Sequence, residues 1–443
     1  MRTSTPLLLV LACGCSMRPE GEQQERERAE AFEFRIPLEK REPLQLAAEP
    51  TLDECVQYAY RSSPGLEVEY QKWRAAIELI PQVSSQPTTL EIGFDVLTGT
   101  GQPSLLDRTN LMLGTDATAM LTWPGKLAAR GRAALETARA AGFHFDQMRG
   151  DLRAKVVSAY VDLAVVGELR VLQRQTVDLL ATTVATLGTR AGTGDASPQD
   201  LVRARLQHSL AVNEGHTLEA TERQRRAKLN ALLGRTDPDA TLVVRMPGPR
   251  PLAFEESRLL EHLRERNPEL KEHGSEILAA KEALAAARME WIPELSLATS
   301  LANATQTLGA SLTLPFLRGA AIRGAIAQAE ALVAEAEAYR RQMQSDMARD
   351  AIVELSLWRD SQRQLELFAT TIVPAAEQAN SLVRTSYGLG RASFLDLVEA
   401  QRAVVETKRM QLLMRAEHER SQAELERIAH SHDDGSGGEQ QKR

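Results

Sequence analysis

Apolar residues recur every three or four positions through two long stretches of the chain, which is the pattern of amphipathic helices. In the first stretch they are Leu152, Val156, Tyr160, Leu163, Val177, Leu180, Val184 and Leu187. No proline lies between Lys126 and Leu187. This stretch therefore predicts one unbroken helix, roughly 90 Å long at a rise of 1.5 Å per residue. The second stretch runs from Ala320 to about Ile372, where Pro374 predicts a kink or a break.

Two other segments alternate between apolar and small or polar residues, with the period of a β-strand. Residues 294–315, with a turn near 303–305, predict two strands of about ten residues. Residues 90–96 and 111–121 predict a similar pair. Ten residues is about the length that a tilted strand needs to cross an outer membrane. A soluble hairpin with one wet face alternates in the same way, so the pattern alone leaves both interpretations open. Aromatic residues mark the strand ends, as in membrane strands: Trp123, Trp291 and Phe316.

A repeated motif relates these parts to one another. The segment from Gly192 to Ala204 recurs from Gly388 to Ala400 in the shared form G-x-G-x-A-S-x-x-D-L-V-x-A. Further matches follow in the same order, among them Ser63-Pro64 with Asn267-Pro268 and Ile80-Pro81 with Ile292-Pro293. The chain is therefore interpreted as a tandem duplication, with a first repeat at residues 51–245 and a second at 246–430.

Each repeat has the same internal order of elements. An opening helix (about 51–79 or 255–290, the first being several residues shorter) ends at the Ile-Pro pair. A strand pair follows, then a very long helix that runs to the G-x-G motif, and then a returning helix. The predicted fold is mainly α with a small β part.

The repeated motif predicts a tight turn between two antiparallel helices. Its glycines permit a left-handed backbone at a helix end: Gly192, Gly194, Gly388 and Gly390. The serine of each copy, Ser197 or Ser393, is expected to cap the next helix. The aspartate three residues later, Asp200 or Asp396, completes a capping box in which Asp replaces Glu. A phosphate-binding loop is disfavoured, because no Lys-Ser or Lys-Thr follows and no strand precedes the glycines.

The beginning of the chain has the features of an export signal. Arg2 and a short apolar run lead to Cys13-Gly-Cys15, so residues 1–15 are predicted to be a signal peptide and lipobox. Cys15 is the preferred lipidated residue and Cys13 the alternative; an ordinary signal peptide is also open. Residues 16–50 are charged and contain prolines, which suits a tether or an extended arm. Residues 431–443 are expected to be a disordered tail.

Composition narrows the function classes further. The net charge of −7 disfavours a nucleic-acid partner. The eight histidines are scattered, and the usual catalytic and nucleotide-binding motifs are missing, so we expect no enzyme activity, no metal site and no cofactor. Aromatic residues make up only 4% of the chain, which favours long helices packed through small side chains.

Together, the two repeats, the strand pairs, the paired turn motifs and the lipobox resemble the TolC-like outer-membrane efflux protein family. Further segments similar to the family are Trp123-Pro-Gly-Lys126, Leu229-Asn-Ala-Leu-Leu-Gly234 and the segment from Leu52 to Ala59. The resemblance covers Thr51 to about Ile428. It implies a homotrimer in the outer membrane, with a twelve-stranded transmembrane β-barrel, four strands per chain, continued by an α-helical tunnel into the periplasm.

The resemblance also implies partners and a gate. The partners are a periplasmic adaptor protein, an inner-membrane pump, of RND type in preference to ABC type, and outer-membrane lipid. The adaptor is expected at the turn glycines. Residue by residue, the resemblance places the periplasmic gate at these positions: Asp200, Tyr387, Arg391, Asp396 and Glu399. Asp396 and Glu399 would form the constricting acidic ring, while Tyr387 and Arg391 would link to Asp200 and hold the entrance shut.

The expected function is thus a passive exit duct for metal ions or drugs. Trp123-Pro-Gly-Lys126 looks more like the heavy-metal branch of the family than the protein-secretion branch, although Met and His are not enriched. Two alternatives remain open at this point. One is a lipid-anchored periplasmic scaffold without a pore, and the other is the outer-membrane component of type I protein secretion.

Overall fold

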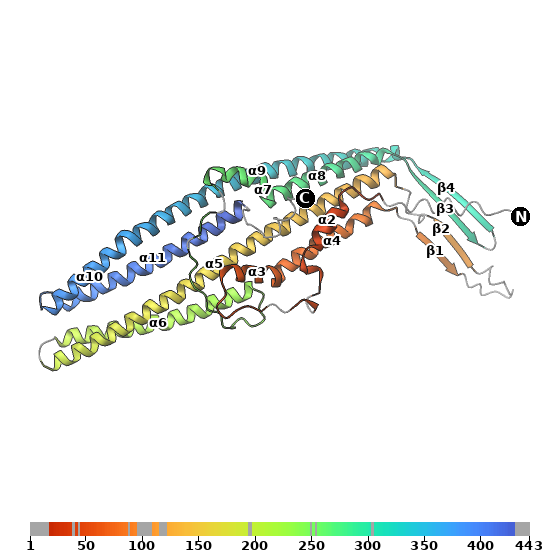
Figure 1. Ribbon diagram of the computed structural model, residues 1–443. Helices are drawn as coiled ribbons and strands as arrows, with labels where there is room; N and C mark the ends of the chain where they lie inside the picture. The colour runs from red at the N-terminus through yellow and green to blue at the C-terminus, as the bar shows by residue number, and fades with distance from the viewer. Residues whose placement is uncertain are drawn as a thin grey trace, which may run out of the picture. The chain divides into compact units, whose positions relative to one another are not determined.

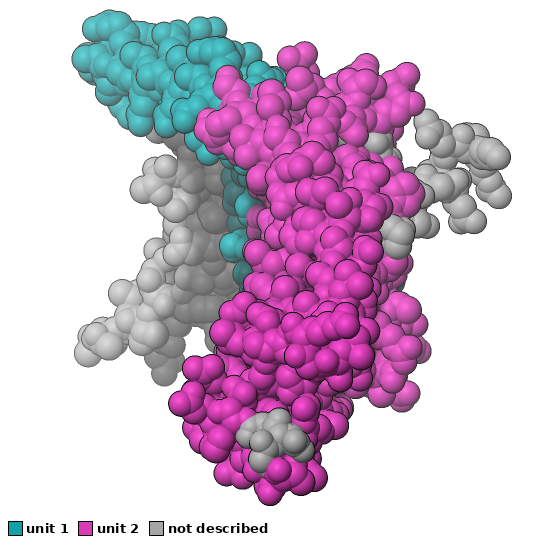
Figure 2. Space-filling model, turned by 90° about the vertical axis from the view of Figure 1, so that its left-hand side faces the viewer, with its two compact units in different colours: residues 1–38, 68–146, 268–344 teal, residues 39–67, 147–267, 345–443 magenta. Residues whose placement is uncertain are grey.

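A computed structural model describes residues 17–37, 40–42, 45–86, 89–94, 109–114, 122–193, 197–248, 250–252, 255–302 and 305–429 (Figure 1). The predicted signal and lipobox, with Cys13 and Cys15, and the tail at 431–443 lie outside this range. The chain forms two compact units, coloured separately in Figure 2. Unit 1 comprises residues 1–38, 68–146 and 268–344, and unit 2 comprises residues 39–67, 147–267 and 345–443. Each unit draws on both sequence repeats.

The described chain is dominated by helices. Their bounds are α2 (Glu22–Glu30), α3 (Leu52–Ser62), α4 (Pro64–Ser84), α5 (Pro124–Gly192), α6 (Pro198–Leu232), α7 (Leu259–Arg266), α8 (Pro268–Arg288), α9 (Gly319–Leu367), α10 (Val373–Gly388) and α11 (Phe394–Ala429). Short turns of tighter helix stand at η2 (Glu33–Arg35), η5 (Glu256–Arg258), η6 (Met289–Trp291) and η7 (Pro315–Arg318). The 69 residues of α5 confirm the predicted unbroken helix.

The opening helix of each repeat is divided in two by the matched Ser-Pro or Asn-Pro pair. Ser63 and Asn267 have extended backbones, because a residue that precedes proline is hindered from the helical region. The expectation of a shorter first opening helix was wrong, since α4 and α8 both have 21 residues. Nor does α4 end at Ile80. It continues through Pro81 to Ser84. The side chains of Ile77 and Ile80 are buried, and this packing favours continuation of the helix by one more turn.

The second long helix is interrupted where the sequence predicts. After α9 the chain passes through a π-helical turn, η8 (Phe368–Ile372), and resumes as α10. Pro374 lacks an amide hydrogen and its ring crowds the carbonyl four residues earlier, at Thr370. The wider turn accommodates this conflict without ending the helical course.

Four antiparallel strands form one sheet in unit 1, in the order β1 (Thr89–Phe94), β2 (Thr109–Gly114), β3 (Glu294–Ala302) and β4 (Thr305–Thr313). The predicted pair of nearly ten-residue strands is confirmed by β3 and β4, of nine residues each. Their register sets Leu295 opposite Leu312 and Leu297 opposite Ala310, so the apolar positions of both strands share a face. Pairing of β2 with β3 joins the first repeat to the second.

Residues 17–37, the first part of the segment expected to be a tether, pack within unit 1 and contain α2. Phe34 is buried, and Phe32 lies 4.9 Å, centroid to centroid, from the ring of Phe145 on α5. On α4, the Tyr70 hydroxyl donates a hydrogen bond to the Ala29 carbonyl (3.1 Å). The sparse aromatics are therefore concentrated where the arm packs, which sequence periodicity could not indicate.

A glycine on α5 makes this docking possible. A Cβ at Gly142 would stand 2.9 Å from the Trp73 indole and 2.8 Å from a carboxylate oxygen of Glu25. Trp73 is fully buried, and its Nε1 donates to that carboxylate (2.9 Å). Burial raises the pKa of Glu25, while Arg28 opposes the shift. Gly142 thus leaves the space in which the arm and α4 meet α5.

Candidate functional site at the hairpin tips

At the tip between α10 and α11, two backbone hydrogen bonds close the end of α10. The amide of Gly390 donates to the Tyr387 carbonyl (3.0 Å), and the amide of Arg391 donates to the Ser386 carbonyl (2.8 Å). Gly390 has a φ of 71°, in the left-handed region. This combination is a Schellman motif, in which a left-handed residue lets the chain turn back over the helix end. The prediction for Gly390 is confirmed.

The same tip starts α11 with a reciprocal cap. The amide of Asp396 donates to the Ser393 hydroxyl oxygen (3.2 Å). In return, the Ser393 amide and hydroxyl both donate to one oxygen of the Asp396 carboxylate (2.8 Å each). These hydrogen bonds hold the pKa of Asp396 below its usual value. The predicted capping box with Asp in place of Glu is confirmed here.

The tip between α5 and α6 is built differently. Gly192 is the last residue of α5, and Gly388 likewise ends α10; neither has a positive φ. The expectation of left-handed backbone at these two residues was therefore wrong, because each still belongs to its helix. Gly194 lies outside the described residues. Ser197 does cap α6, accepting from the amide of Gln199 (3.2 Å), but Asp200 returns no bond to it among the described contacts.

An apolar cluster joins the two tips within unit 2. Its buried members are Leu187 of α5, Ala204 of α6, and Phe394 and Val398 of α11. Sequence reasoning missed this cluster, although one signal was present. At the position where the first copy of the motif has Pro198, the second has Phe394. Phe394 is 5% exposed, so this difference between the copies supplies the contact.

Aromatic and cationic side chains cover the edge of this cluster. The ring of Tyr387 lies 6.4 Å from that of Phe394, and the Arg190 guanidinium lies 6.0 Å from the Tyr387 centroid. At that distance the cation is attracted by the face of the ring. Tyr387 of one tip is thus in contact with Arg190 of the other, a contact that the motif alone does not predict.

A cavity of about 430 Å³ lies between the tips. Asp200 and Tyr387, both expected at the gate, line it together with Arg190 and Arg203. Arg391 does not line it, and among the described contacts its side chain forms no ion pair with Asp200. Asp396 and Glu399 are exposed on the first turns of α11. Within one chain, the structure therefore brings Tyr387 and Asp200 to a common cavity and leaves the acidic pair facing solvent.

A second notable feature lies in unit 1, at the ends of the strands. The Lys126 ammonium contacts the carboxylates of Glu290 (2.6 Å) and Glu294 (2.8 Å), and its side chain is only 4% exposed. The Trp123 indole donates to the Pro293 carbonyl (2.5 Å). The Trp-Pro-Gly-Lys segment of the first repeat is thereby tied to the strand entry of the second. Large apolar residues around these ends are exposed: Trp123, Trp291, Leu312, Leu314, Phe316 and Leu317.

None of the helices in the described ranges is both long and apolar enough to cross a membrane. Among the side chains that the structure describes, no group of three or more His, Cys, Asp or Glu has an arrangement that would hold a metal ion.

Comparison with known sequences identifies relatives. Residues 259–429 match the family described as outer membrane efflux protein. The cobalt-zinc-cadmium resistance protein CzcC of Cupriavidus metallidurans is 25% identical over 297 residues, which is 64% of this chain and 69% of that protein.

Solved structures have the same fold at low sequence identity. CusC, described in terms of its folding and transmembrane channel formation, superposes with a TM-score of 0.73 at 15% identity, over 86% of this chain and 92% of CusC. The open state of the MtrE outer membrane channel of Neisseria gonorrhoeae gives a TM-score of 0.72 at 15% identity, over 88% of this chain and 93% of MtrE.

Proposed function

We propose that this chain, whose residues 259–429 match the outer membrane efflux protein family, is the exit duct of a tripartite efflux system. It would conduct cargo passively from an inner-membrane pump and a periplasmic adaptor to the cell exterior. The family is not enzymatic, and a duct of this kind needs no catalytic group. Energy would come from the pump.

The observation that carries the proposal is the four-stranded sheet with unpaired outer edges. Within the described residues, β1 and β4 each pair on one side only. Open edges are not tolerated in lipid, so a membrane-embedded sheet of this size requires other copies of the chain. Three copies would close a twelve-stranded barrel. Exposed Trp123, Trp291 and Phe316 at the strand ends suit the boundary between lipid and water.

The hairpin tips are the proposed docking surface for the adaptor. Three chains would present six tips built on the same sequence frame. The proposed contact residues are Gly192, Gly194, Gly388 and Gly390. Leu389, which lies between Gly388 and Gly390 and is 65% exposed, adds apolar surface beside these glycines. An RND-type pump is proposed in preference to an ABC-type pump.

The proposed entrance gate is made by residues of the same tips. In a trimer, Asp396 and Glu399 of each chain would form a ring of six carboxylates, which attracts cations. Capping does not prevent this role, since the bonds from Ser393 keep the Asp396 carboxyl ionised. Tyr387 and Arg391, with Asp200, remain the proposed latch. Within one chain the described contacts include no ion pair between Arg391 and Asp200, so this link would have to form in the assembled trimer.

Divalent metal ions are the proposed cargo. The relative that supports this is a cobalt-zinc-cadmium resistance protein, and the Trp123-Pro-Gly-Lys126 segment favours the same branch. Acylation of Cys15 and sorting to the outer membrane are proposed from the sequence of the lipobox. Mass spectrometry of the mature N-terminus tests this point separately from the channel.

A planar-bilayer recording on the purified full chain tests the duct. We expect stepwise conductance with cation preference, and a weaker preference in the double variant Asp396→Ala, Glu399→Ala. Arg391→Ser should raise the resting conductance if the latch exists. A purified trimer that conducts in none of these forms would instead favour the scaffold without a pore. Normal conductance with unchanged selectivity in the double variant would overturn the acidic ring alone.

A further inference from the structure

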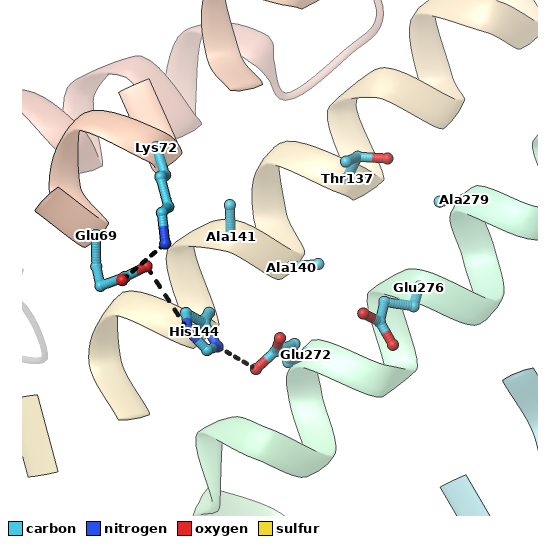
Figure 3. Close-up of a pocket in the computed structure, with 9 residues that line it drawn as sticks. All are labelled: Glu69, Lys72, Thr137, Ala140, Ala141, His144, Glu272, Glu276 and Ala279. Carbon is cyan, nitrogen blue, oxygen red and sulfur yellow. Dashed lines mark hydrogen bonds and ion pairs between the residues drawn. The ribbon is translucent and has the colours of Figure 1, made fainter. Parts of the chain in front are cut away.

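A single histidine in unit 1 stands between helices of the two repeats. His144 on α5 has one ring nitrogen, Nδ1, 3.2 Å from the Glu272 carboxylate on α8. Its other nitrogen, Nε2, is 3.7 Å from the Glu69 carboxylate on α4 (Figure 3). The two carboxylates are largely buried, at 15% and 17% exposure, while the imidazole is 38% exposed.

This arrangement suits a protonated imidazole better than a neutral one. A neutral imidazole has one N–H, so it can donate to only one of the two carboxylates. Its other nitrogen then presents a lone pair to a negatively charged oxygen. An imidazolium donates from both nitrogens and pairs with both carboxylates at once. The number of bonds between α4, α5 and α8 therefore depends on one proton.

The charged groups around His144 accentuate this dependence. On α4, Glu69 also pairs with Lys72 (2.9 Å), so its charge has a permanent partner. On α8, Glu272 has no lysine or arginine partner among the described contacts, and nearby Glu276 adds negative charge. Burial raises the pKa of Glu272, and the positive charge of His144 opposes that shift. Protonation of His144 thus supplies the missing countercharge on the α8 side.

Protons can reach the imidazole from the adjoining cavity. This cavity has a volume of about 500 Å³ and is open to solvent; small side chains leave it room: Thr137, Ala140, Ala141 and Ala279. A second histidine, His273 of α8, lies close by. It contacts Glu276 of its own helix (2.7 Å) and the ring of Tyr339 on α9. Its ion pair lies within one helix, so it does not join α4 to α8.

Other charged pairs between helices of unit 1 are permanent. Lys281 contacts Glu337 (2.8 Å), Arg288 contacts Glu330 (3.0 Å), and Arg132 contacts Glu282 (2.8 Å). Lysine and arginine do not titrate between pH 5 and 8, whereas histidine does. Among these interhelical contacts, the His144 pair is set apart because its cation is an imidazole.

We propose that His144 is a proton-operated clamp that joins α4 of the first repeat to α8 of the second. Acidification closes the clamp by adding an ion pair between Nε2 and the Glu69 carboxylate, 3.7 Å away, and neutral pH relaxes it. Unit 1 is accordingly more rigid in mildly acidic surroundings. The inference depends on the geometry of unit 1 and not on the proposed function.

Hydrogen–deuterium exchange of the full chain tests the clamp, read on peptides from residues 64–84 and 268–288 and corrected for intrinsic exchange. From pH 7.5 to pH 5.5, protection of both segments should rise roughly threefold to tenfold, the size of one added charge-assisted bond with partial solvent screening. His144→Gln keeps a neutral amide donor group and does not titrate, so the protection of both segments in this variant should stay flat across this range.

Two further variants make the result decisive. Lys281→Gln breaks a permanent pair in the same unit and should keep the pH response of the parent chain. Glu272→Gln should lose the response, which provides a second test if His144→Gln folds poorly. A parent chain without a pH response, or a response that survives His144→Gln, would overturn the proposal. So would a response that disappears in His273→Gln and persists in His144→Gln.

Discussion

The two hairpin tips share one sequence frame and yet differ in how their backbone is held. At the second tip, a Schellman motif ends α10 and a reciprocal capping box starts α11. At the first, α5 runs straight to Gly192 and Ser197 supplies a single cap bond. The repeated motif therefore specifies where the chain turns, whereas the residues at its variable positions decide how firmly the backbone of the turn is held. The second tip is expected to be the more rigid of the two.

The largest effect on hydrogen exchange is expected from a change at Phe394, where the first copy of the motif has Pro198. Phe394→Ala removes a buried ring that contacts both tips, and such a truncation costs about 3 kcal/mol or more. We expect faster hydrogen exchange in residues 184–204 and in 384–400 together. The matched control is Pro198→Ala, at the equivalent and exposed position of the first tip, which should change little. Loosening confined to the second tip would show that Phe394 does not hold the tips together.

The next largest effect is the difference between valine substitutions at Gly390 and at Gly192, which differ in backbone conformation. A Cβ would meet nothing within 4 Å at Gly390 or at Gly192, so crowding is equal at both. Only Gly390 has a positive φ, where a β-branched residue costs about 1–2 kcal/mol. Gly390→Val should therefore lower protection of the second tip. Gly192→Val should leave the first tip as protected as before or slightly more so, because valine favours a helix over glycine. Equal losses in both variants would contradict this assignment.

A smaller effect should distinguish the two caps. Ser393→Ala removes the two bonds of the hydroxyl, keeps the amide bond to Asp396, and should cost about 1 kcal/mol. Ser197→Ala removes one backbone bond and should cost about half as much, near 0.5 kcal/mol. Hydrogen exchange in the first turns of α11 and α6 measures the local stability lost in each variant. The comparison would fail if Ser197→Ala proved the more damaging change.

The smallest effect is a difference in acid sensitivity. The Ser393 bonds lower the pKa of Asp396 in the folded tip, so they contribute stability above the unfolded pKa that is lost as pH falls through the folded value. Protection of the second tip should decline between about pH 5 and pH 3. Asp396→Asn should remove this decline, and the first tip should not show it. Identical acid profiles at the two tips would indicate that the carboxylate bond is unimportant.

Much of the fold could be predicted because its signals are local. The proline-free run before Leu187, Pro374, and the alternation around Leu295 each set a local backbone preference, and the structure follows all three. The capping box at Ser393 was also predictable, since it spans only three residues. These features depend on neighbours in sequence, which the chain itself displays.

The remaining features depend on partners that are distant in sequence. The sequence does not reveal that Gly142 leaves room for Trp73, since 69 residues separate them. The expectation of a left-handed backbone was wrong at Gly192 and Gly388, because a glycine permits that conformation without requiring it. The contact between Arg190 and Tyr387 arises from the meeting of two tips about 200 residues apart in sequence, and periodicity carries no information about it.

The buried lysine at the strand ends has a consequence for how a duplicated chain diverges. In the first repeat, Lys126 is enclosed by Glu290 and Glu294 of the second. At the matching position after Leu314-Pro315, the second repeat has Leu317, which is 82% exposed. By the match of Ile80-Pro81 with Ile292-Pro293, Glu290 has a counterpart in Glu78, whereas Glu294 corresponds to Gln82. Two first halves would therefore offer the ammonium group one carboxylate in place of two, and two second halves would offer the carboxylates no lysine. Divergence of the repeats has placed the two sides of this ion-pair cluster on different halves of the chain.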